Sequence, residues 1–183
     1  MKYFQEINFP NFKHADNEIQ EYFNYLYPDK TNIKNFFNFP SKDDFIKMCP
    51  TVLKGFEELQ LHFKGIFMIG IVHNTNRNIH IDNSPHPCRL QWPLLNSHSV
   101  ETVWYEADPK DKITEILPNG VPYVSYRSQD CKEIARTCIV SPTIIRVEQP
   151  HAVDRTSNNP ADFPRAAFSF AFVETLEDML ENE

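Results

Sequence analysis

The chain has 183 residues, 41% of them hydrophobic and 13% aromatic, which is the composition of a single folded domain and excludes a disordered segment. Its formal net charge of −7, without a cluster of basic residues, disfavours nucleic acid as a partner. The four glycines cannot form a dinucleotide fingerprint, a P-loop or a G-x-S-x-G elbow, so the common signals for these chemistries are absent.

The first sixty residues show helical periodicity. Asp16 is predicted to cap a helix that ends before Pro28, with apolar residues at helical spacing: Ile19, Tyr22, Phe23 and Leu26. Ser41, with Asp44 three residues later, indicates the start of a second helix that runs through Met48. A third helix is predicted to begin at Pro50 and to carry its apolar residues on one face: Val52, Leu53, Phe56 and Leu59.

From residue 61 the apolar residues recur with the period of strands. Strands are predicted at 61–72, 78–82, 89–95, 99–107, 121–127, 142–153 and 165–173. Many short strands without long intervening helices favour an antiparallel barrel or sandwich over residues 61–175. The tail, residues 175–183, is expected to form a short helix with three apolar residues on one face: Leu176, Met179 and Leu180.

Two further features concern the cell compartment. The start, MKYFQEINF, lacks the basic and apolar parts of a secretory signal, and the longest apolar run, residues 65–72, is too short to span a bilayer. The cysteines form no C-x-x-C pair and are predicted to be reduced thiols: Cys49, Cys88, Cys131 and Cys138. We therefore expect a soluble, cytoplasmic protein without a membrane partner.

A histidine and an aspartate stand on alternate positions of the strand predicted at 78–82. His80 and Asp82 therefore share one face of that strand. His151 follows Pro150 within the strand predicted at 142–153. Two histidines and one carboxylate are the ligand set of non-haem Fe(II), which they hold while leaving coordination positions open. No ligand role is expected for the other histidines: His14, His62, His73, His86 and His98.

An arginine follows the distal histidine. Arg165 lies fourteen residues after His151 and shares a strand face with Ala167 and Ser169. Arg89 and Gln91 likewise share a face in the strand predicted at 89–95. Because a buried guanidinium requires an anion, these residues indicate a site for a ligand carboxylate.

The H-x-D pair, the histidine of P-H-A-V and the later arginine resemble the Fe(II)/2-oxoglutarate-dependent oxygenases. Within that superfamily, R-L-Q-W-P-L at residues 89–94 is similar to the R-x-[HN]-x-P-L segment of the aspartyl/asparaginyl β-hydroxylase-type branch. The sequence departs from the pattern of the branch at Gln91, at Asp154-Arg155 and in its longer spacing from the distal histidine to the arginine. The similarity covers about half the chain, from Ile66 to Val173.

The resemblance implies a double-stranded β-helix, a jelly-roll or cupin-like barrel, packed against helices. It implies that Fe(II) is held by His80, Asp82 and His151. It also implies that 2-oxoglutarate is bound by a second group: Arg165, Ser169, Arg89 and Gln91. Dioxygen is then the co-reactant, and an amino-acid side chain in a protein, a peptide or a free amino acid is hydroxylated. Trp92, Asn96 and Trp104 are pocket walls on this interpretation, and both tryptophans have core packing as the alternative.

Three alternatives remain open from the residues. A cupin-like metal jelly roll would share the three ligands but would not respond to 2-oxoglutarate. A non-enzymatic β-sandwich predicts that His80 and His151 lie far apart. A zinc hydrolase has less support, because H-x-x-E-H, H-E-x-x-H and H-x-H are absent, although zinc can occupy such a site. Within the oxygenases, a prolyl-hydroxylase-like enzyme is the second choice.

Overall fold

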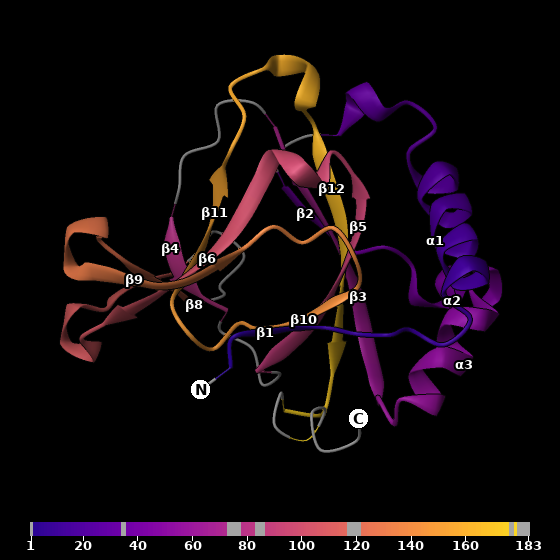
Figure 1. Cartoon of the computed structure of the whole chain (residues 1–183), viewed down its shortest axis with the longest axis horizontal. Coiled ribbons are helices and arrows are strands. Elements are labelled where there is room, and N and C mark those ends of the chain that lie inside the picture. Colours follow the sequence, from indigo (N-terminus) through magenta and orange to yellow (C-terminus); the bar gives the residue numbers. More distant parts are fainter. Residues whose placement is uncertain are drawn as a thin grey trace.

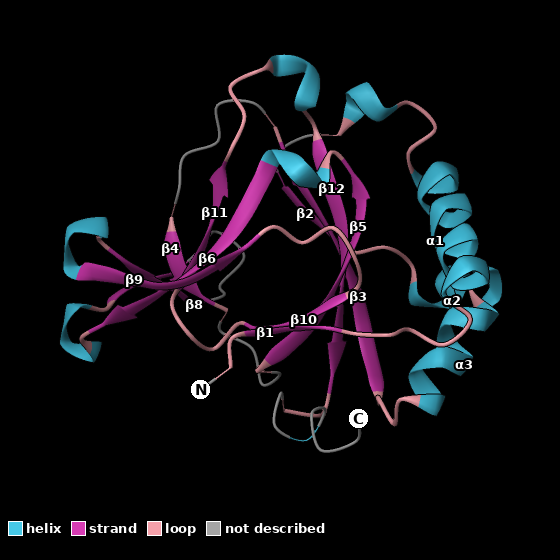
Figure 2. Cartoon of the chain, in the orientation of Figure 1, coloured by secondary structure: helices cyan, strands magenta, loops and turns pink. Residues whose placement is uncertain are grey.

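The computed structural model describes residues 2–33, 36–72, 78–82, 87–116, 122–175 and 178. Three α-helices lie among them: α1 (Phe12–Leu26), α2 (Lys42–Met48) and α3 (Pro50–Glu58). Five short 3-10 helices connect other elements: η1 (Lys30–Asn32), η2 (Ser97–Ser99), η3 (Pro109–Asp111), η4 (Ser128–Asp130) and η5 (Pro160–Asp162). Two sheets face each other, and the α-helices cover the outer side of one of them (Figures 1 and 2).

Each sheet has six described strands, and all of the strand pairs described are antiparallel. The sheet that the helices cover is called the larger sheet here, because its strands are longer on average. It has the order β1 (Phe4–Glu6), β10 (Thr143–Arg146), β5 (Cys88–Leu95), β12 (Arg165–Phe172), β3 (Phe63–Ile71) and β2 (Phe36–Asn38). The second sheet has the order β7 (Ile113–Ile116), β8 (Pro122–Tyr126), β4 (Ile79–Ile81), β11 (His151–Arg155), β6 (Val100–Ala107) and β9 (Cys131–Thr137).

An aromatic core joins the helices to the larger sheet. Phe168 and Phe170 lie on one face of β12, and their ring centroids are 5.7 Å from Tyr22 and 5.3 Å from Phe45, respectively. Each fully buried phenylalanine of this kind stabilises the fold by about 1.5–3 kcal/mol. Because side chains alternate along a strand, the opposite face of β12 is turned toward the second sheet and carries Arg165 and Ser169.

The helix boundaries confirm some of the predicted caps and correct one. Ser41 caps α2, since its hydroxyl accepts a hydrogen bond from the Asp44 amide at 3.2 Å, and Pro50 is the first residue of α3. The prediction that Asp16 caps α1 is wrong, because the helix already begins at Phe12. Asp16 lies within the helix instead, where its carboxylate accepts a hydrogen bond from the Trp92 indole at 2.9 Å.

The second sheet departs further from the prediction. The segment 142–153 forms two strands, β10 and β11, which belong to different sheets. The physical reason lies in residues 147–150, where the Val147 amide donates to Pro87 and the Tyr105 amide donates to Pro150, so the chain crosses between the sheets. The strands β1, β2, β7 and β9 were not predicted, and β7 and β9 contain no buried residue and no strong apolar alternation.

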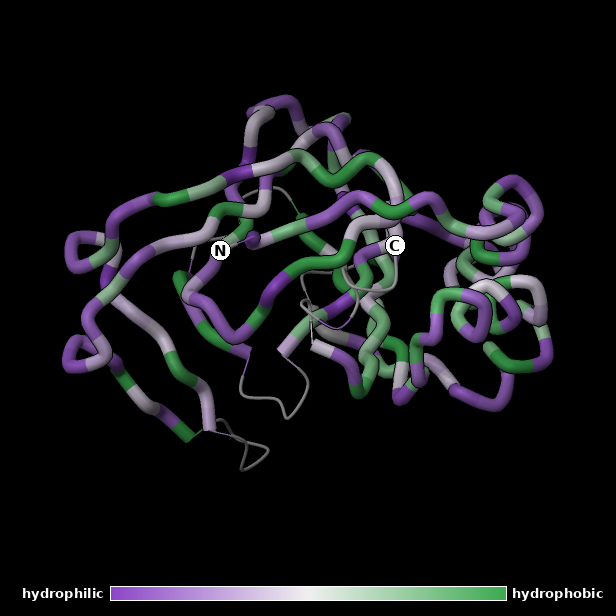
Figure 3. The backbone as a smooth tube through the Cα atoms, turned by 60° about the horizontal axis from the view of Figure 1, so that its bottom comes forward, coloured by the Kyte–Doolittle hydropathy of each residue, from purple (hydrophilic) through white to green (hydrophobic). Residues whose placement is uncertain are grey.

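The described chain is therefore mostly β, with two antiparallel sheets. The first sixty residues contain all three α-helices but also β1 and β2. Figure 3 shows apolar and polar residues alternating along many strands, and hydrophilic turns at the far edge of the second sheet. All four cysteines are free, as predicted. Among the described residues, no helix is both long and apolar enough to cross a membrane. Most of the predicted C-terminal helix lies outside the described residues.

Candidate metal centre

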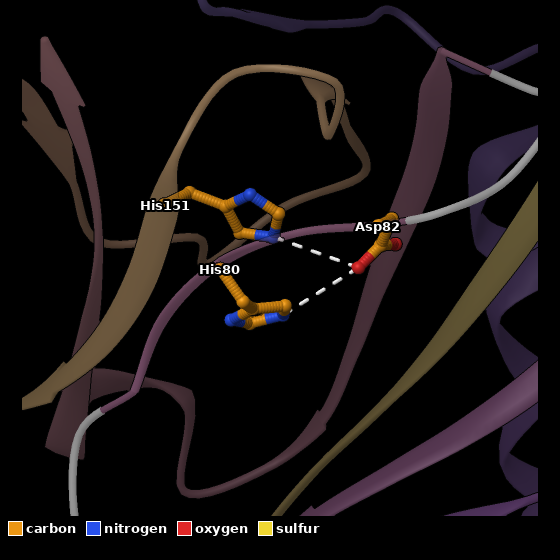
Figure 4. Close-up of side chains that lie close together, drawn as sticks. All are labelled: His80, Asp82 and His151. Carbon is orange, nitrogen blue, oxygen red and sulfur yellow. Dashed lines mark ion pairs between the residues drawn. The ribbon is translucent and has the colours of Figure 1, made fainter. Parts of the chain in front are cut away.

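The three predicted metal ligands meet between two paired strands of the second sheet. His80 of β4 lies opposite His151 of β11 in the strand register, and Asp82 directly follows β4. The Asp82 Oδ1 atom is 3.5 Å from His80 Nε2 and 4.0 Å from His151 Nε2. Figure 4 shows the three side chains directed toward one another. If the motif were a coincidence, His80 and His151 would be expected to lie far apart. They lie opposite each other instead.

These separations fit one metal ion. Donor atoms that each lie about 2.1 Å from an ion can be at most about 4.2 Å apart. The two measured distances to Asp82 fall within that limit, and the three ligand atoms all lie within 4.8 Å of one another. A small movement of the side chains would bring all three ligand atoms to bonding distance from one ion. Among the described residues, this is the group of His, Cys, Asp and Glu side chains that lie close enough together to hold a metal ion.

Backbone carbonyls orient both imidazoles. His80 Nδ1 lies 2.9 Å from the carbonyl oxygen of Asn78, and His151 Nδ1 lies 2.9 Å from that of Gln149. Since a carbonyl can only accept, each Nδ1 carries a proton, and in the neutral imidazole Nε2 is then the nitrogen with a lone pair for a metal. Both lone pairs lie on the side of Asp82. Imidazoles fixed in this way are typical of metal ligands.

Burial and mutual contacts shift the pKa of all three groups. Burial, together with the nearby charge of His80, lowers the pKa of His151 to about 4, so this imidazole is neutral at pH 7. Burial acts to raise the pKa of Asp82, but its contacts with His80, His151 and Arg89 lower that pKa overall, and the carboxylate is ionised. Burial acts to lower the pKa of His80, but its contacts with Asp82 and with the Asn78 carbonyl together raise it, so a metal ion at this site competes with a proton for His80.

The connection between β10 and β11 holds two of the ligands in place. The Asp82 amide donates to the Val147 carbonyl at 3.0 Å, and the Gln149 carbonyl holds the His151 ring. The Gln149 side chain is itself fixed, because its amide nitrogen donates to the Tyr105 carbonyl at 2.6 Å. One short segment therefore couples the carboxylate ligand to the distal histidine.

Arg89 is the guanidinium that the structure places beside the ligands. Its Nη2 atom is 3.9 Å from the Asp82 carboxylate, and its Cζ atom lies 5.3 Å from the centroid of the Phe67 ring. The side chain is buried on the inner face of β5. Arg89 therefore brings positive charge to the second oxygen of the carboxylate ligand.

Gln91 and Ser169 form a buried polar pair next to Arg89. They lie opposite each other in the pairing of β5 with β12, and Gln91 Nε2 donates to Ser169 Oγ at 3.0 Å. Gln91 Oε1 is buried and has no hydrogen-bond partner among the described residues. The hydroxyl hydrogen of Ser169 is free to donate, so the pair retains hydrogen-bonding capacity for a ligand.

Arg165 faces the interior but begins β12 at the end remote from Arg89. It is 3% exposed, and its Nε atom has no partner in the described part of the chain. Burial lowers its pKa to about 10. Arg89 pairs with Ala171, six residues farther along β12, and six residues of strand span about 20 Å. The structure therefore unites Arg89, Gln91 and Ser169 and leaves Arg165 farther from the ligands.

The three residues expected as pocket walls have other positions. Trp92 points to the helices, where its ring centroid lies 4.8 Å from that of Phe9. Trp104 is fully buried beside His151 in the register, and its indole donates to the Arg146 carbonyl at 2.8 Å. Core packing, the alternative for both tryptophans, fits these contacts. The Asn96 side chain donates to the carbonyl of residue 164, beside Arg165.

Other residues at the site were not predicted from the sequence. Tyr123 of β8 stacks on His80, and Asn78 and Gln149 supply the carbonyls described above. In the strand predicted at 121–127, Tyr123 and Ser125 stand two residues apart and therefore share one face. This spacing was the sequence signal that could have placed Tyr123 on a polar face. Of the remaining histidines, His62 pairs with Glu174 and His98 lies near Asp162 at the surface. His73 and His86 lie outside the described residues, and His14 lines a different pocket.

Comparison of the chain with protein-family models and with curated proteins found no match, so its assignment depends on the geometry of the site.

Proposed function

We propose that the protein is an Fe(II)- and 2-oxoglutarate-dependent dioxygenase that hydroxylates a C–H bond. The observation that carries the proposal is the His80–Asp82–His151 cluster, in which both Nε2 lone pairs are directed to one side of a carboxylate. Two imidazoles and one carboxylate suit ferrous iron and leave coordination positions for a cosubstrate and dioxygen.

The order of the strands supports a double-stranded β-helix as the fold. Leaving out β1, β2, β7 and β8, the strands pair in nested fashion: β3 with β12, β4 with β11, β5 with β10 and β6 with β9. Two arms of the chain, β3–β6 and β9–β12, thus run antiparallel along their whole length. This nesting is what winding one long hairpin into a jelly roll produces.

The interior offers groups for the cosubstrate. Bound through its 2-oxo acid end to the metal, 2-oxoglutarate would extend along the inner face of β5 and β12. The Ser169 hydroxyl, held by the Gln91 amide, would donate to its distal carboxylate, and Arg89 and Arg165 would supply positive charge from the two ends of this face. Ala167, between Arg165 and Ser169, is small and leaves the space between them unfilled by its own side chain.

When bound, the iron would couple the oxidation of 2-oxoglutarate by dioxygen, to succinate and CO₂, to the hydroxylation of the substrate. The protein would orient both reactants and keep His80 and His151 in the tautomer that binds metal. By the resemblance to the β-hydroxylase-type branch, the substrate is an amino-acid side chain of a protein, a peptide or a free amino acid. We place this activity in the cytoplasm.

Anaerobic titration with Fe(II) and then 2-oxoglutarate tests the proposal. We expect a visible metal-to-ligand charge-transfer band for the wild-type protein and none for His151→Ala. His98→Ala, which removes a surface histidine, is the matched control and should keep the band. Metal binding without a band would favour the cupin-like alternative, and failure to bind metal would contradict both.

A further inference from the structure

The β7–β8 hairpin stands outside the nested strand pairs and yet borders the metal site. β8 pairs with β4, so that Ser125 lies opposite His80 and Val124 lies opposite Ile81. Since side chains alternate, Tyr123 and Ser125 share the face of His80. An added strand thus brings one aromatic side chain to a proposed metal ligand.

Two neighbours contact the ring of His80. The Tyr123 ring is stacked on it, with centroids 5.7 Å apart and an interplanar angle of 24°. The backbone carbonyl of Asn78 accepts its Nδ1 hydrogen at 2.9 Å.

Each contact restricts the imidazole. Stacking limits rotation of the ring, and the Asn78 carbonyl keeps the proton on Nδ1. An imidazole held in advance loses less entropy when it binds a metal, and outer partners of a metal ligand typically alter metal affinity by about 10- to 100-fold. We propose that Tyr123 is a positioning residue that holds His80 for metal binding by stacking on its ring. This inference depends on the proposed metal site.

The same strand provides a matched control. Tyr126 is opposite Ile79 and belongs to an apolar cluster on the other face of the sheet, together with Ile79, Val124 and Ala152. Tyr126→Leu removes the same kind of ring from the same strand without touching His80. A general effect of altering β8 would appear in both variants, whereas a positioning effect appears only at Tyr123.

Anaerobic titration with Co(II), followed by its visible absorption spectrum, tests the proposal without requiring activity. We expect Tyr123→Leu, which removes the stacked ring, to raise the Kd for Co(II) about 10-fold or more. Its ligand-field bands should shift, whereas Tyr123→Phe, which keeps the ring, and Tyr126→Leu should both resemble wild type. Circular dichroism confirms that each variant is folded.

Tyr123→Phe separates the ring from its hydroxyl. An equal loss of Co(II) affinity in Tyr123→Phe and Tyr123→Leu would assign the effect to the hydroxyl and contradict the stacking role. Wild-type affinity and an unchanged spectrum in Tyr123→Leu would overturn the positioning role while leaving the metal site in place. Failure of the wild-type protein to bind Co(II) would overturn the metal site itself.

Discussion

The charge of Arg165 is buried without a counter-ion among the described residues. The side chain is 3% exposed, and burial lowers its pKa to about 10. A guanidinium in this setting destabilises the ligand-free fold, because its hydration is lost and nothing in the described chain replaces it. Residues that bind an anionic ligand commonly carry such a cost, which the ligand offsets when it binds.

Arg165→Met is therefore expected to raise the stability of the ligand-free protein and to weaken ligand binding. The ligand-free variant should be more stable than wild type by about 1–3 kcal/mol, because a buried charge is replaced by an apolar chain of similar length. The same variant should lose the response to 2-oxoglutarate. Urea unfolding measures the first effect and the charge-transfer titration the second. Lys54→Met, on the exposed face of α3, should change neither. A destabilised Arg165→Met would mean that the charge is already satisfied.

The layer of helices contributes a different kind of buried group. Cys49, at the junction of α2 and α3, is fully buried, and desolvation with the charge of Glu18 raises the pKa of its thiol to about 12. Burial likewise raises the pKa of Tyr22 on α1. Both groups remain neutral in the folded protein at pH values where the unfolded chain begins to ionise.

This difference predicts a loss of stability in alkali. The unfolded thiol releases its proton near pH 8.5 and the folded thiol of Cys49 near pH 12, so the free energy of unfolding is highest below about pH 8.5 and falls as the pH rises through that range. We expect a loss of about 2 kcal/mol from Cys49 at pH 10. Urea unfolding at pH 7.5 and 10 measures it, and Cys49→Ala should show a correspondingly smaller loss. An equal loss in that variant would assign the effect to other groups.

The sequence predicted features that depend on local periodicity. The apolar spacing around Phe23 and Phe56 located two of the helices, and H-x-D with a distal histidine located the three ligands that converge. Alternation along residues 165–173 also predicted that Arg165 and Ser169 face away from the aromatic core.

Features that depend on long-range pairing were missed. The break between β10 and β11 comes from hydrogen bonds to Pro87 and Tyr105, which lie far away in the sequence. Tyr123 reaches His80 only because β8 pairs with β4. The position of Arg165 relative to the ligands follows from the register of β12 on β5, and nothing in the local sequence determines a register between strands so far apart.

At the scale of the whole molecule, the proposed metal site joins parts of the chain that are about seventy residues apart. His80 and Asp82 come from the first arm of the nested strands, and His151 comes from the second. An ion bound by all three would therefore hold the two arms together. Binding to the folded state alone stabilises that state by mass action.

Metal is accordingly expected to stabilise the protein. At a concentration about 100 times its Kd, Co(II) should raise the free energy of unfolding by about 3 kcal/mol, and EDTA should reverse the increase. His151→Ala should lose this response, and His98→Ala should retain it. Thermal unfolding followed by circular dichroism measures each case. The same increase in His151→Ala would show that Co(II) binds elsewhere.

The place of β12 also has a consequence for synthesis. β12 is the last described strand, and it lies between β3 and β5 in the middle of the larger sheet. While the chain emerges from the ribosome, that sheet stays in two halves until residues 165–172 arrive, and the aromatic side chains of the helices have no Phe168 or Phe170 to cover them. The larger sheet is thus completed only when residues 165–172 are present, and its many distant pairings predict slow folding. Until then, the uncovered aromatic side chains favour aggregation of the nascent chain.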